Sequence, residues 1–248
     1  MKRVKYVAKI DDFRLKAFQS GVIGWYRQHG RDLPWRQTRD PYAIIVSEIM
    51  LHQTTVATVI PVYRRFIAEF PDVKTLNLAP LEDVKAITDP LGYKIRGRWL
   101  KDIAAAVVNR WGGRFPNTVE DLMSLPGVGR YTAGAVLSFA FGQDAPILDT
   151  NVKRVLGRYF GIDFKETRAE MHHRLWALAE AVLPSGGAMD FNQALMDFGA
   201  MVCTARKPAC TICPLLDACV SRGWEDSAHA AEDGQVYQIA PRPKPAEA

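Results

Sequence analysis

Residues 125–158, LPGVGRYTAGAVLSFAFGQDAPILDTNVKRVLGR, decide the fold and most of the chemistry in this chain of 248 residues. The run opens with Leu-Pro-Gly-Val-Gly, and we expect Gly127 and Gly129 to form a hairpin by adopting φ values that other residues avoid. An apolar helix is predicted from Arg130 onward. Its first N–H groups, next to two glycines, form an anion site that suits a phosphate and reads no base sequence. An ordinary turn between two helices would give the same Gly-x-Gly pattern.

A second feature lies at residues 147–155, with the sequence ILDTNVKRV. Asp149 is predicted at the N-terminus of the next helix, beside Lys153 and Arg154, and a helix N-terminus favours the ionised carboxylate. Capping the helix is the usual role of an Asp in that position. The hairpin that precedes it makes Asp149 a candidate for catalysis as well.

Together the two motifs, LPGVGRYTAGAV and ILDTNVKRV, resemble the helix-hairpin-helix DNA glycosylase superfamily. The resemblance implies that the hairpin grips a DNA phosphate while Asp149 faces the sugar of a flipped nucleotide. It also implies that Tyr131 and Asn151 orient the catalytic groups. The DNA contacts expected from this region are Gly127, Gly129, Lys153 and Arg154.

Glu48 is the polar exception in a long helical pattern that starts at Pro41, with Pro61 expected to begin a further helix. Its neighbours at three and four positions are Ile44, Ile45, Leu51 and His52, so a helix places it beside apolar side chains. Burial would raise the pKa of the carboxyl toward that of a general acid, although the wet edge of a helix is the commoner place for a Glu.

The surrounding segment, PYAIIVSEIMLHQT, resembles the SEVMLQQT segment of MutY-type adenine DNA glycosylases. This implies that Glu48 protonates the departing base. Their environments would then keep Glu48 protonated and Asp149 ionised, which is how such a pair divides its roles.

The Leu-Gly-Tyr sequence that ends at Tyr93 resembles the Gly-Leu-Gly-Tyr-Tyr wedge of the same family. The resemblance implies that Tyr93 and Gln53 push into the duplex opposite the flipped base and partly offset the loss of stacking. The match has departures, because Pro90 replaces the first Gly of the wedge, Lys94 replaces its second Tyr, and His52 replaces a Gln. These departures affect recognition of the opposing base more than the chemistry.

Trp35 and Arg36 follow Pro34 on a segment that cannot be helical across the proline. Such a pair suits stacking and hydrogen bonding to a base, and a Trp beside a Pro equally suits core packing. The resemblance adds Val56 and Gln193 to Trp35 and Arg36 as base-pocket candidates.

Two resemblances imply different identities for the base that is removed. RDLPWRQTRDPY and GRYFG are similar to thymine-DNA mismatch glycosylases, and the chain lacks the C-terminal Nudix-like domain with which MutY-type enzymes recognise 8-oxoguanine. Thymine-mismatch relatives tend to carry Ala and Leu at the positions of Val56 and Gln193, and an amide can pair with a purine edge where Leu cannot. We therefore expect adenine opposite guanine or 8-oxoguanine, with weakened preference for 8-oxoguanine, and keep thymine or uracil opposite guanine as the alternative.

All four cysteines lie near the C-terminus in a C-x6-C-x2-C-x5-C pattern: Cys203, Cys210, Cys213 and Cys219. Clustered thiols in a chain without export features suggest a metal rather than disulfides, and zinc is one possibility. The spacing resembles the cluster loop of endonuclease III and MutY-type enzymes, which implies a 4Fe-4S cluster. Arg206 and Lys207, between the first two cysteines, are placed to meet a DNA phosphate.

The composition fits a DNA-binding protein, with a net charge of +5 and ten Lys or Arg against five acidic residues between positions 91 and 158. A solvated charged face would have the same composition. The opening residues are basic without an apolar segment behind them, and no apolar run reaches membrane-spanning length. We expect a monomer in the cytoplasm, at the nucleoid, that binds mismatched double-stranded DNA and no membrane.

The resemblance implies an all-α, two-lobed helix-hairpin-helix DNA glycosylase fold. The expected parts are a six-helix barrel domain at 28–141, an iron-sulfur cluster domain at 1–27 plus 142–222, and a disordered tail at 223–248 that is poor in apolar residues. The expected activity is that of a monofunctional DNA N-glycosylase, since bifunctional relatives carry a Schiff-base Lys where this chain has Tyr131. A DNA-binding iron-sulfur protein without catalysis is the remaining alternative.

Overall fold

The computed structural model describes residues 10–162 and 167–222, which form α-helices and short 3-10 helices with no β-strand among them. The all-α prediction is therefore confirmed. No helix within these two ranges combines the length and the apolar character needed to cross a bilayer. The predicted disordered tail, residues 223–248, lies outside the described residues.

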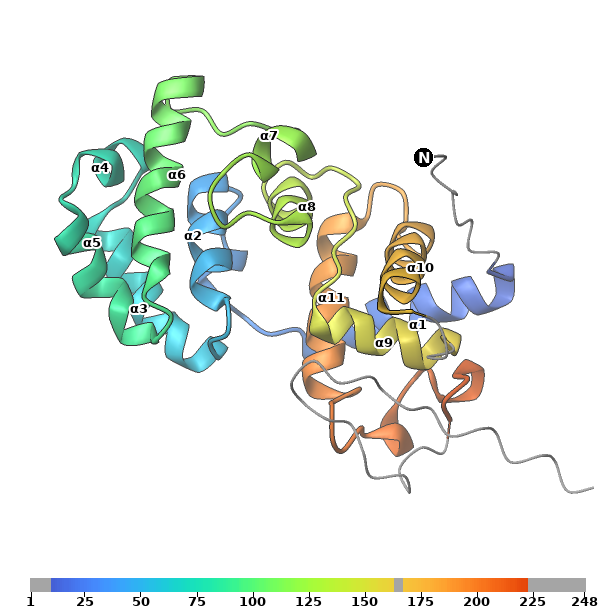
Figure 1. The fold of residues 1–248 in the computed structure, drawn as a ribbon. Coiled ribbons are helices and arrows are strands. Elements are labelled where there is room, and N and C mark those ends of the chain that lie inside the picture. The colour runs from blue at the N-terminus through green and yellow to red at the C-terminus, as the bar shows by residue number, and fades with distance from the viewer. Residues whose placement is uncertain (1–9, 163–166, 223–248) are drawn as a thin grey trace, which may run out of the picture. The chain divides into compact units, whose positions relative to one another are not determined.

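Two compact units make up the chain, residues 31–147 and residues 1–30 with 148–248 (Figure 1). The boundaries implied by the resemblance, at 28 and 141, lie a few residues earlier. Helix α1 runs unbroken to His29. The segment after α8 stays with its own unit because it packs on Gly134, where a Cβ would stand 2.3 Å from the Pro146 carbonyl oxygen.

The unit of residues 31–147 is built around helix α2, which is apolar on all sides and buried from Tyr42 to Met50. Helix α2 packs against α3, α6 and α8, and Figure 1 shows α6 and α8 on either side of it. The helices of this unit are η1 (Pro34–Arg36), α2 (Pro41–Leu51), α3 (Val56–Glu69), α4 (Val73–Leu78), α5 (Leu81–Thr88), η2 (Asp89–Leu91), α6 (Ile95–Trp111), α7 (Val119–Met123) and α8 (Arg130–Phe139).

Helix α3 begins before Pro61, so the prediction that Pro61 starts a helix is wrong. Thr55 caps the helix, since its Oγ1 accepts a hydrogen bond from the Thr58 N–H at 3.4 Å, and Pro61 lies inside it. Pro80 separates the two short helices α4 and α5.

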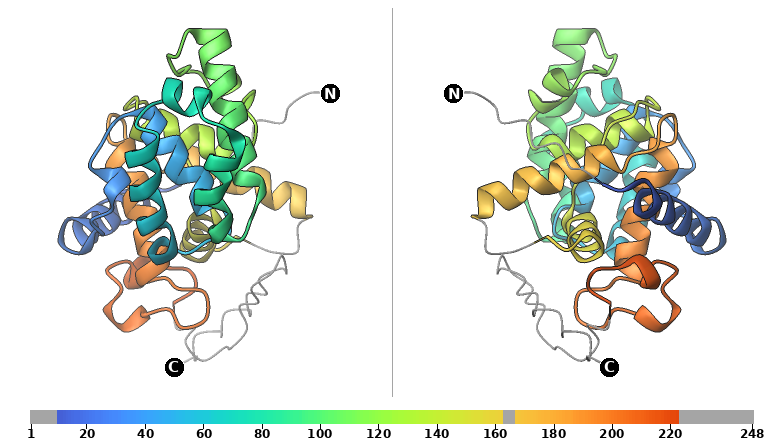
Figure 2. Two further views of the ribbon diagram at one scale, coloured as in Figure 1. Left: turned by 90° about the vertical axis from the view of Figure 1, so that its left-hand side faces the viewer. Right: turned by 90° about the vertical axis from the view of Figure 1, so that its right-hand side faces the viewer.

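The second unit gathers the N-terminal helix and the C-terminal part of the chain. Helix α11 packs against both α1 and α9, and Figure 2 shows the loop that carries the cysteines following the end of α11. The helices of this unit are α1 (Asp12–His29), α9 (Thr150–Phe160), α10 (Arg168–Ala181), α11 (Ala188–Met201), η3 (Cys210–Ile212) and η4 (Leu216–Ala218).

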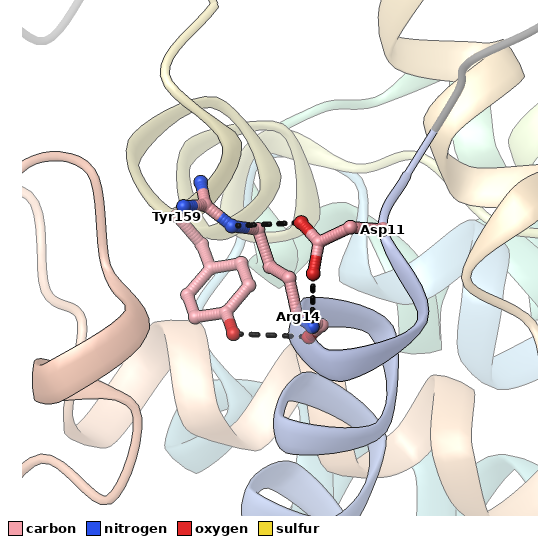
Figure 3. Close-up of polar contacts among 3 residues, drawn as sticks. All are labelled: Asp11, Arg14 and Tyr159. Carbon is pink, nitrogen blue, oxygen red and sulfur yellow. Dashed lines mark hydrogen bonds and ion pairs between the residues drawn. The ribbon is translucent and has the colours of Figure 1, made fainter.

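Tyr159 joins the N-terminal helix to α9 (Figure 3). Its hydroxyl donates to the Arg14 carbonyl oxygen at 3.1 Å, and Asp11 caps the same turn of α1 by accepting from the Arg14 N–H at 2.8 Å. The Tyr159 ring lies 4.7 Å from that of Phe18, which also meets Phe191 of α11. These contacts explain why residues distant in sequence share one core.

Candidate active site and metal centre

The Leu-Pro-Gly-Val-Gly segment forms the predicted hairpin before α8. Gly127 has φ 73°, and a Cβ there would stand 2.6 Å from the Trp99 ring, so both conformation and space require glycine. Gly129 has φ −94°, which any residue can adopt, so the expectation of a restricted φ is wrong for that residue. A Cβ on Gly129 would meet nothing within 4 Å, and the residue is exposed. Gly129 therefore leaves the start of α8 open to a phosphate.

Glu48 lies on the central helix α2 and is 4% exposed. Ile44 and Ile45, one turn earlier, are 2% and 1% exposed. The predicted placement of this carboxyl beside apolar side chains is confirmed. Its function as a general acid stays a prediction.

Asp149 caps helix α9 and is held by two hydrogen bonds. Its Oδ1 accepts from the Val152 N–H at 2.6 Å, and its Oδ2 accepts from Asn151 Nδ2 at 3.0 Å. Burial raises the pKa of Asp149, while these hydrogen bonds and the charge of Arg154 act to lower it. The sequence pattern predicts that the helix N-terminus favours the ionised carboxylate. In the structure, desolvation has the larger effect on the pKa of Asp149 and raises it.

Arg154 belongs to the protein interior rather than to the DNA-facing surface. It is 6% exposed, its Nε donates to the Cys203 carbonyl oxygen at 2.7 Å, and its Nη2 donates to Asn151 Oδ1 at 2.7 Å. A further bond joins Nη2 to the Gly199 carbonyl oxygen. The expected contact of Arg154 with DNA is therefore replaced by a network that runs from Cys203 through Asn151 to Asp149.

Two further basic residues of the expected DNA footprint are also buried, Arg96 at 0% and Arg158 at 7% exposure. Both donate hydrogen bonds to main-chain carbonyl oxygens. Only part of the positive charge between positions 91 and 158 can thus face a phosphate.

The base-pocket candidates differ in placement. Trp35 is 7% exposed and packs edge-on against Tyr63 at 5.3 Å between ring centroids, so core packing accounts for it. Arg36 is half-buried and donates from Nη1 to the Arg31 carbonyl oxygen. Val56 is half-buried at the start of α3.

Gln193 of α11 is 6% exposed, and its Oε1 accepts a hydrogen bond from the Tyr26 hydroxyl at 2.8 Å. The bond fixes the orientation of the side-chain amide. Nothing in the sequence pattern points to Tyr26, because the contact joins helices that are far apart along the chain.

The residues expected to insert into DNA both lie in exposed turns. Gln53 has φ 56°, a left-handed conformation that is uncommon for a residue other than glycine, and its side chain is exposed. Tyr93 is 38% exposed and follows Gly92, whose φ of 93° makes the turn. Tyr131 on α8 and Lys153 on α9 are half-buried.

The four cysteines line one cavity of about 30 Å³, together with Arg158. None of the four forms a disulfide, and Arg158 Nη1 lies 3.5 Å from Cys203 Sγ. Burial raises the pKa of Cys213 to about 11 and that of Cys219 to about 12, so a metal group is needed to hold these sulfurs as thiolates at neutral pH.

These thiols surround the cavity without converging on one point. No three His, Cys, Asp or Glu side chains in the described part of the chain are arranged to hold a single metal ion. Ligands of a cluster bind different iron atoms and need not converge, so the donor set fits a 4Fe-4S group. Arg206 and Lys207 are exposed in the same loop, which the Thr204 hydroxyl closes by donating to the Lys207 carbonyl oxygen at 2.6 Å.

Comparison with known proteins agrees with this geometry. Residues 46–181 match the HhH-GPD superfamily base excision DNA repair protein family, and residues 203–219 match the iron-sulfur binding domain of endonuclease III. The two matches cover the hairpin, both candidate carboxylates and the four cysteines.

Two kinds of relative are similar to the chain. The adenine DNA glycosylase of Buchnera aphidicola subsp. Acyrthosiphon pisum is 41% identical over 212 residues, which are 84% of this chain and 61% of that protein. The thymine/uracil-DNA glycosylase of Pyrobaculum aerophilum is 41% identical over 202 residues, 80% of this chain and 88% of that protein.

A solved structure of a thermostable thymine-DNA glycosylase matches with a TM-score of 0.79 at 37% identity, over 84% of this chain and 96% of the other. The chain therefore spans less than two thirds of the adenine DNA glycosylase and most of the thymine enzymes. It belongs to the HhH-GPD superfamily of base excision DNA repair proteins and carries the iron-sulfur binding domain of endonuclease III.

Proposed function

We propose that the protein is a monofunctional DNA N-glycosylase that removes adenine mispaired with guanine or 8-oxoguanine. The observation that carries the proposal is the pair of carboxyl groups in contrasting surroundings. Glu48 is buried in an apolar helix, and Asp149 is held at a helix start by two donors that, with the charge of Arg154, oppose the rise of its pKa caused by burial. Such a pair can supply an acid and an anion to one reaction.

In this mechanism Glu48 donates its proton to the leaving base, at N7 of adenine, as the bond from the sugar C1′ to the base breaks. The bonding electrons leave with the base, and the sugar becomes an oxocarbenium ion. Asp149 stabilises that cation, either electrostatically or by transient covalent capture, until water adds to C1′. Asn151 keeps the Asp149 carboxylate oriented through its 3.0 Å hydrogen bond.

Gln193 supports adenine as the target. Because its Oε1 accepts from Tyr26, its Nε2 amino group can present hydrogen-bond donors to a base. Adenine offers ring nitrogens as acceptors, and the amide discriminates where an apolar residue could not. Val56 and Arg36 stay candidates for contact with the base.

The absence of an amine at Tyr131 supports base release without strand cutting. A lyase needs a nucleophilic nitrogen that forms a Schiff base with the sugar, and a phenol cannot do so. We propose that Tyr131 helps to orient the catalytic groups instead.

The DNA partner is proposed to be a mismatched duplex, bound by a monomer in the cytoplasm at the nucleoid. The hairpin residues Gly127 and Gly129, with Lys153, Arg206 and Lys207, would contact phosphates, and Gln53 and Tyr93 would enter the duplex. Cys203, Cys210, Cys213 and Cys219 would hold the 4Fe-4S cluster, which ties down the loop that carries Arg206 and Lys207.

A second candidate is removal of thymine or uracil opposite guanine. The match to the thymine-DNA glycosylase structure, at 37% identity and a TM-score of 0.79, is the observation that favours it. The Pyrobaculum relative supports the same candidate.

One single-turnover comparison decides between the candidates, using adenine opposite guanine, adenine opposite 8-oxoguanine, thymine opposite guanine and uracil opposite guanine. We expect adenine to be released fastest, with strands that break only after hot alkali. Faster release of thymine or uracil would favour the second candidate. Base release from none of the four duplexes would favour a DNA-binding protein without catalysis, and robust borohydride trapping of the protein on DNA would contradict the monofunctional assignment.

A further inference from the structure

Arg96, near the start of α6, is a fully buried cation that the catalytic mechanism does not use. Its side chain is 0% exposed. Its Nε donates to the Ile49 carbonyl oxygen at 3.2 Å, and its Nη1 donates to the Leu91 carbonyl oxygen at 3.1 Å. Its Nη2 donates to the His52 carbonyl oxygen and to Thr54 Oγ1. Only the planar guanidinium, with donors in a fixed fork, can reach all four acceptors.

Two of these acceptors belong to the end of α2. The last carbonyl groups of a helix lack partners within the helix, and Arg96 supplies donors to Ile49 and His52. A cation in this position is also favoured by the helix dipole. Arg96 therefore caps α2 at the point where the chain turns toward Gln53.

The turn that follows holds Gln53 in an uncommon conformation, with φ 56°. A left-handed residue other than glycine is strained and persists only when its surroundings fix it. Arg96 contacts the residues on both sides of Gln53, since Nη2 donates to His52 and to Thr54. The guanidinium thus holds Gln53 in place without touching it.

The same guanidinium holds the second exposed turn. The Leu91 carbonyl oxygen accepts from Arg96 Nη1 and from Thr54 Oγ1, at 3.1 and 3.3 Å. Tyr93, two residues further on, places its ring over the guanidinium carbon at 5.5 Å from the centroid. That distance permits a cation–π attraction. One side chain therefore joins the turn of Gln53 to the turn of Tyr93.

An aromatic contact extends this arrangement toward the hairpin. The Trp99 ring lies 5.6 Å from Tyr93 and 6.0 Å from His52, edge-on in both cases. It also occupies the space that a Cβ on Gly127 would need. The two turns and the hairpin thus pack on neighbouring residues of α6.

We propose that Arg96 is a positioning residue that fixes Gln53 and Tyr93 relative to each other, so that both side chains enter the duplex together. The insertion role of Gln53 and Tyr93 rests on the proposed function. The connection between their turns, which we call the latch, is argued independently of that role, from the hydrogen bonds of Arg96 and the Thr54–Leu91 hydrogen bond. Pro90 and Lys94, which depart from the family wedge, are exposed and lie outside this set of contacts, which explains how the turn tolerates them.

The first test measures the latch in the free protein, without DNA. Arg96→Lys keeps the positive charge and removes the planar set of guanidinium donors. Hydrogen exchange is measured in peptides that cover residues 51–55 and 89–94. We expect exchange of both peptides to accelerate together, by about tenfold or more. Thr54→Val, a milder change that removes one acceptor of Arg96 and one donor to Leu91, should act on both peptides in the same direction.

Ile103→Ala is the matched control, because Ile103 is buried on the same helix at 2% exposure and has no part in these hydrogen bonds. It should lower the melting temperature without a selective increase of hydrogen exchange in the two peptides. Acceleration of only one peptide in the Arg96 and Thr54 variants, or an equal response in Ile103→Ala, would overturn the proposal.

The second test measures duplex opening with 2-aminopurine placed beside the mismatch. The Arg96→Lys protein should open the duplex about tenfold less readily, because a small misplacement of inserting groups is enough to lose that much. Its base release should recover when the target adenine faces an abasic site, where no partner has to be displaced. An equal loss on both substrates would contradict a positioning role.

These readouts separate this proposal from the proposed function. If the wild-type protein released no base, the glycosylase assignment would fail, while exchange in the two peptides would still test the latch. If the wild type released base and the two turns exchanged independently of Arg96, only the latch would fail.

Discussion

The two carboxyl groups of the proposed reaction lie in contrasting surroundings. Glu48 lies in the middle of α2, a helix buried from residue 42 to residue 50, and its side chain is 4% exposed. Asp149 begins a helix and is positioned by hydrogen bonds from Val152 and Asn151. Glu48 thus lies inside a buried helix, whereas Asp149 lies at a helix start, where its hydrogen-bond partners can be removed one at a time. The comparison predicts that removing the acid of Glu48 affects chemistry alone, whereas changes at Asp149 or Asn151 affect pH dependence or stability as well.

The largest effect is expected from Glu48→Gln, which preserves shape and removes the acid. Base release under single turnover should fall by about 10³-fold, within the range for loss of a general acid. The melting temperature and duplex affinity should change little, since the buried volume is the same. Glu69→Gln, an exposed position on α3, is the control and should match the wild type. Release within about tenfold of the wild type by the Glu48 variant would refute the assignment.

Cys210→Ser should have the next largest effect, because it removes one proposed ligand of the cluster in the unit that contains Asp149. We expect loss of the brown colour and of the iron-sulfur absorbance, a lower melting temperature and duplex binding weaker by about tenfold or more. Thr211→Ser, in the same loop, should keep all of these properties. A colourless wild-type protein with one zinc atom would show that the cluster assignment is mistaken.

Asn151→Ala sharpens the comparison by removing one partner of Asp149. Its hydrogen bond lowers the pKa of Asp149, so without it that pKa rises and the anion is lost at higher pH. The acid limb of the pH–rate profile should therefore move to higher pH by about one unit. Thr150→Ala, an exposed neighbour, should leave the limb in place. If the acid limb of the Asn151 variant stays at the wild-type pH, the pKa of Asp149 does not depend on its hydrogen bond from Asn151.

The smallest effect concerns folding stability and should be a gain. The pKa of Asp149 is raised by folding, so the native state binds more protons than the unfolded state, and stability falls as pH rises through this window. Asp149→Asn keeps an N-cap acceptor and removes the buried charge. At pH 8 the variant should be more stable by about 1 kcal/mol, a rise of about 2–4 °C in melting temperature. An advantage that persists unchanged at low pH would exclude buried charge as its origin.

Local patterns predicted the parts of the site that depend on local structure. The Gly-x-Gly hairpin, the cysteine spacing and the apolar neighbours of Glu48 each lie within a short stretch of sequence, and the structure places them as expected apart from the φ of Gly129. The burial of Arg96, Arg154 and Arg158 was not predicted, because their acceptors are carbonyl groups from other segments.

A signal for one of these arginines was present. Arg96 is followed by Trp99, Leu100 and Ile103 at helical spacing, the same apolar surroundings that singled out Glu48. This spacing predicts a buried Arg96, whereas its charge alone is typical of a surface residue. Trp35 and Gln193 could not be placed in this way, since their partners Tyr63 and Tyr26 come from distant helices.

The central claim is that Glu48 and Asp149, held in such different ways, serve one chemical step. The direct measurement is the single-turnover rate of adenine release for Glu48→Gln, Asp149→Asn and the double variant on one adenine–guanine duplex. If both groups act in the same transition state, the double variant should be about as slow as the slower single variant, since effects of residues that act as a unit do not multiply. A double variant whose loss equals the product of the two single losses would contradict the account.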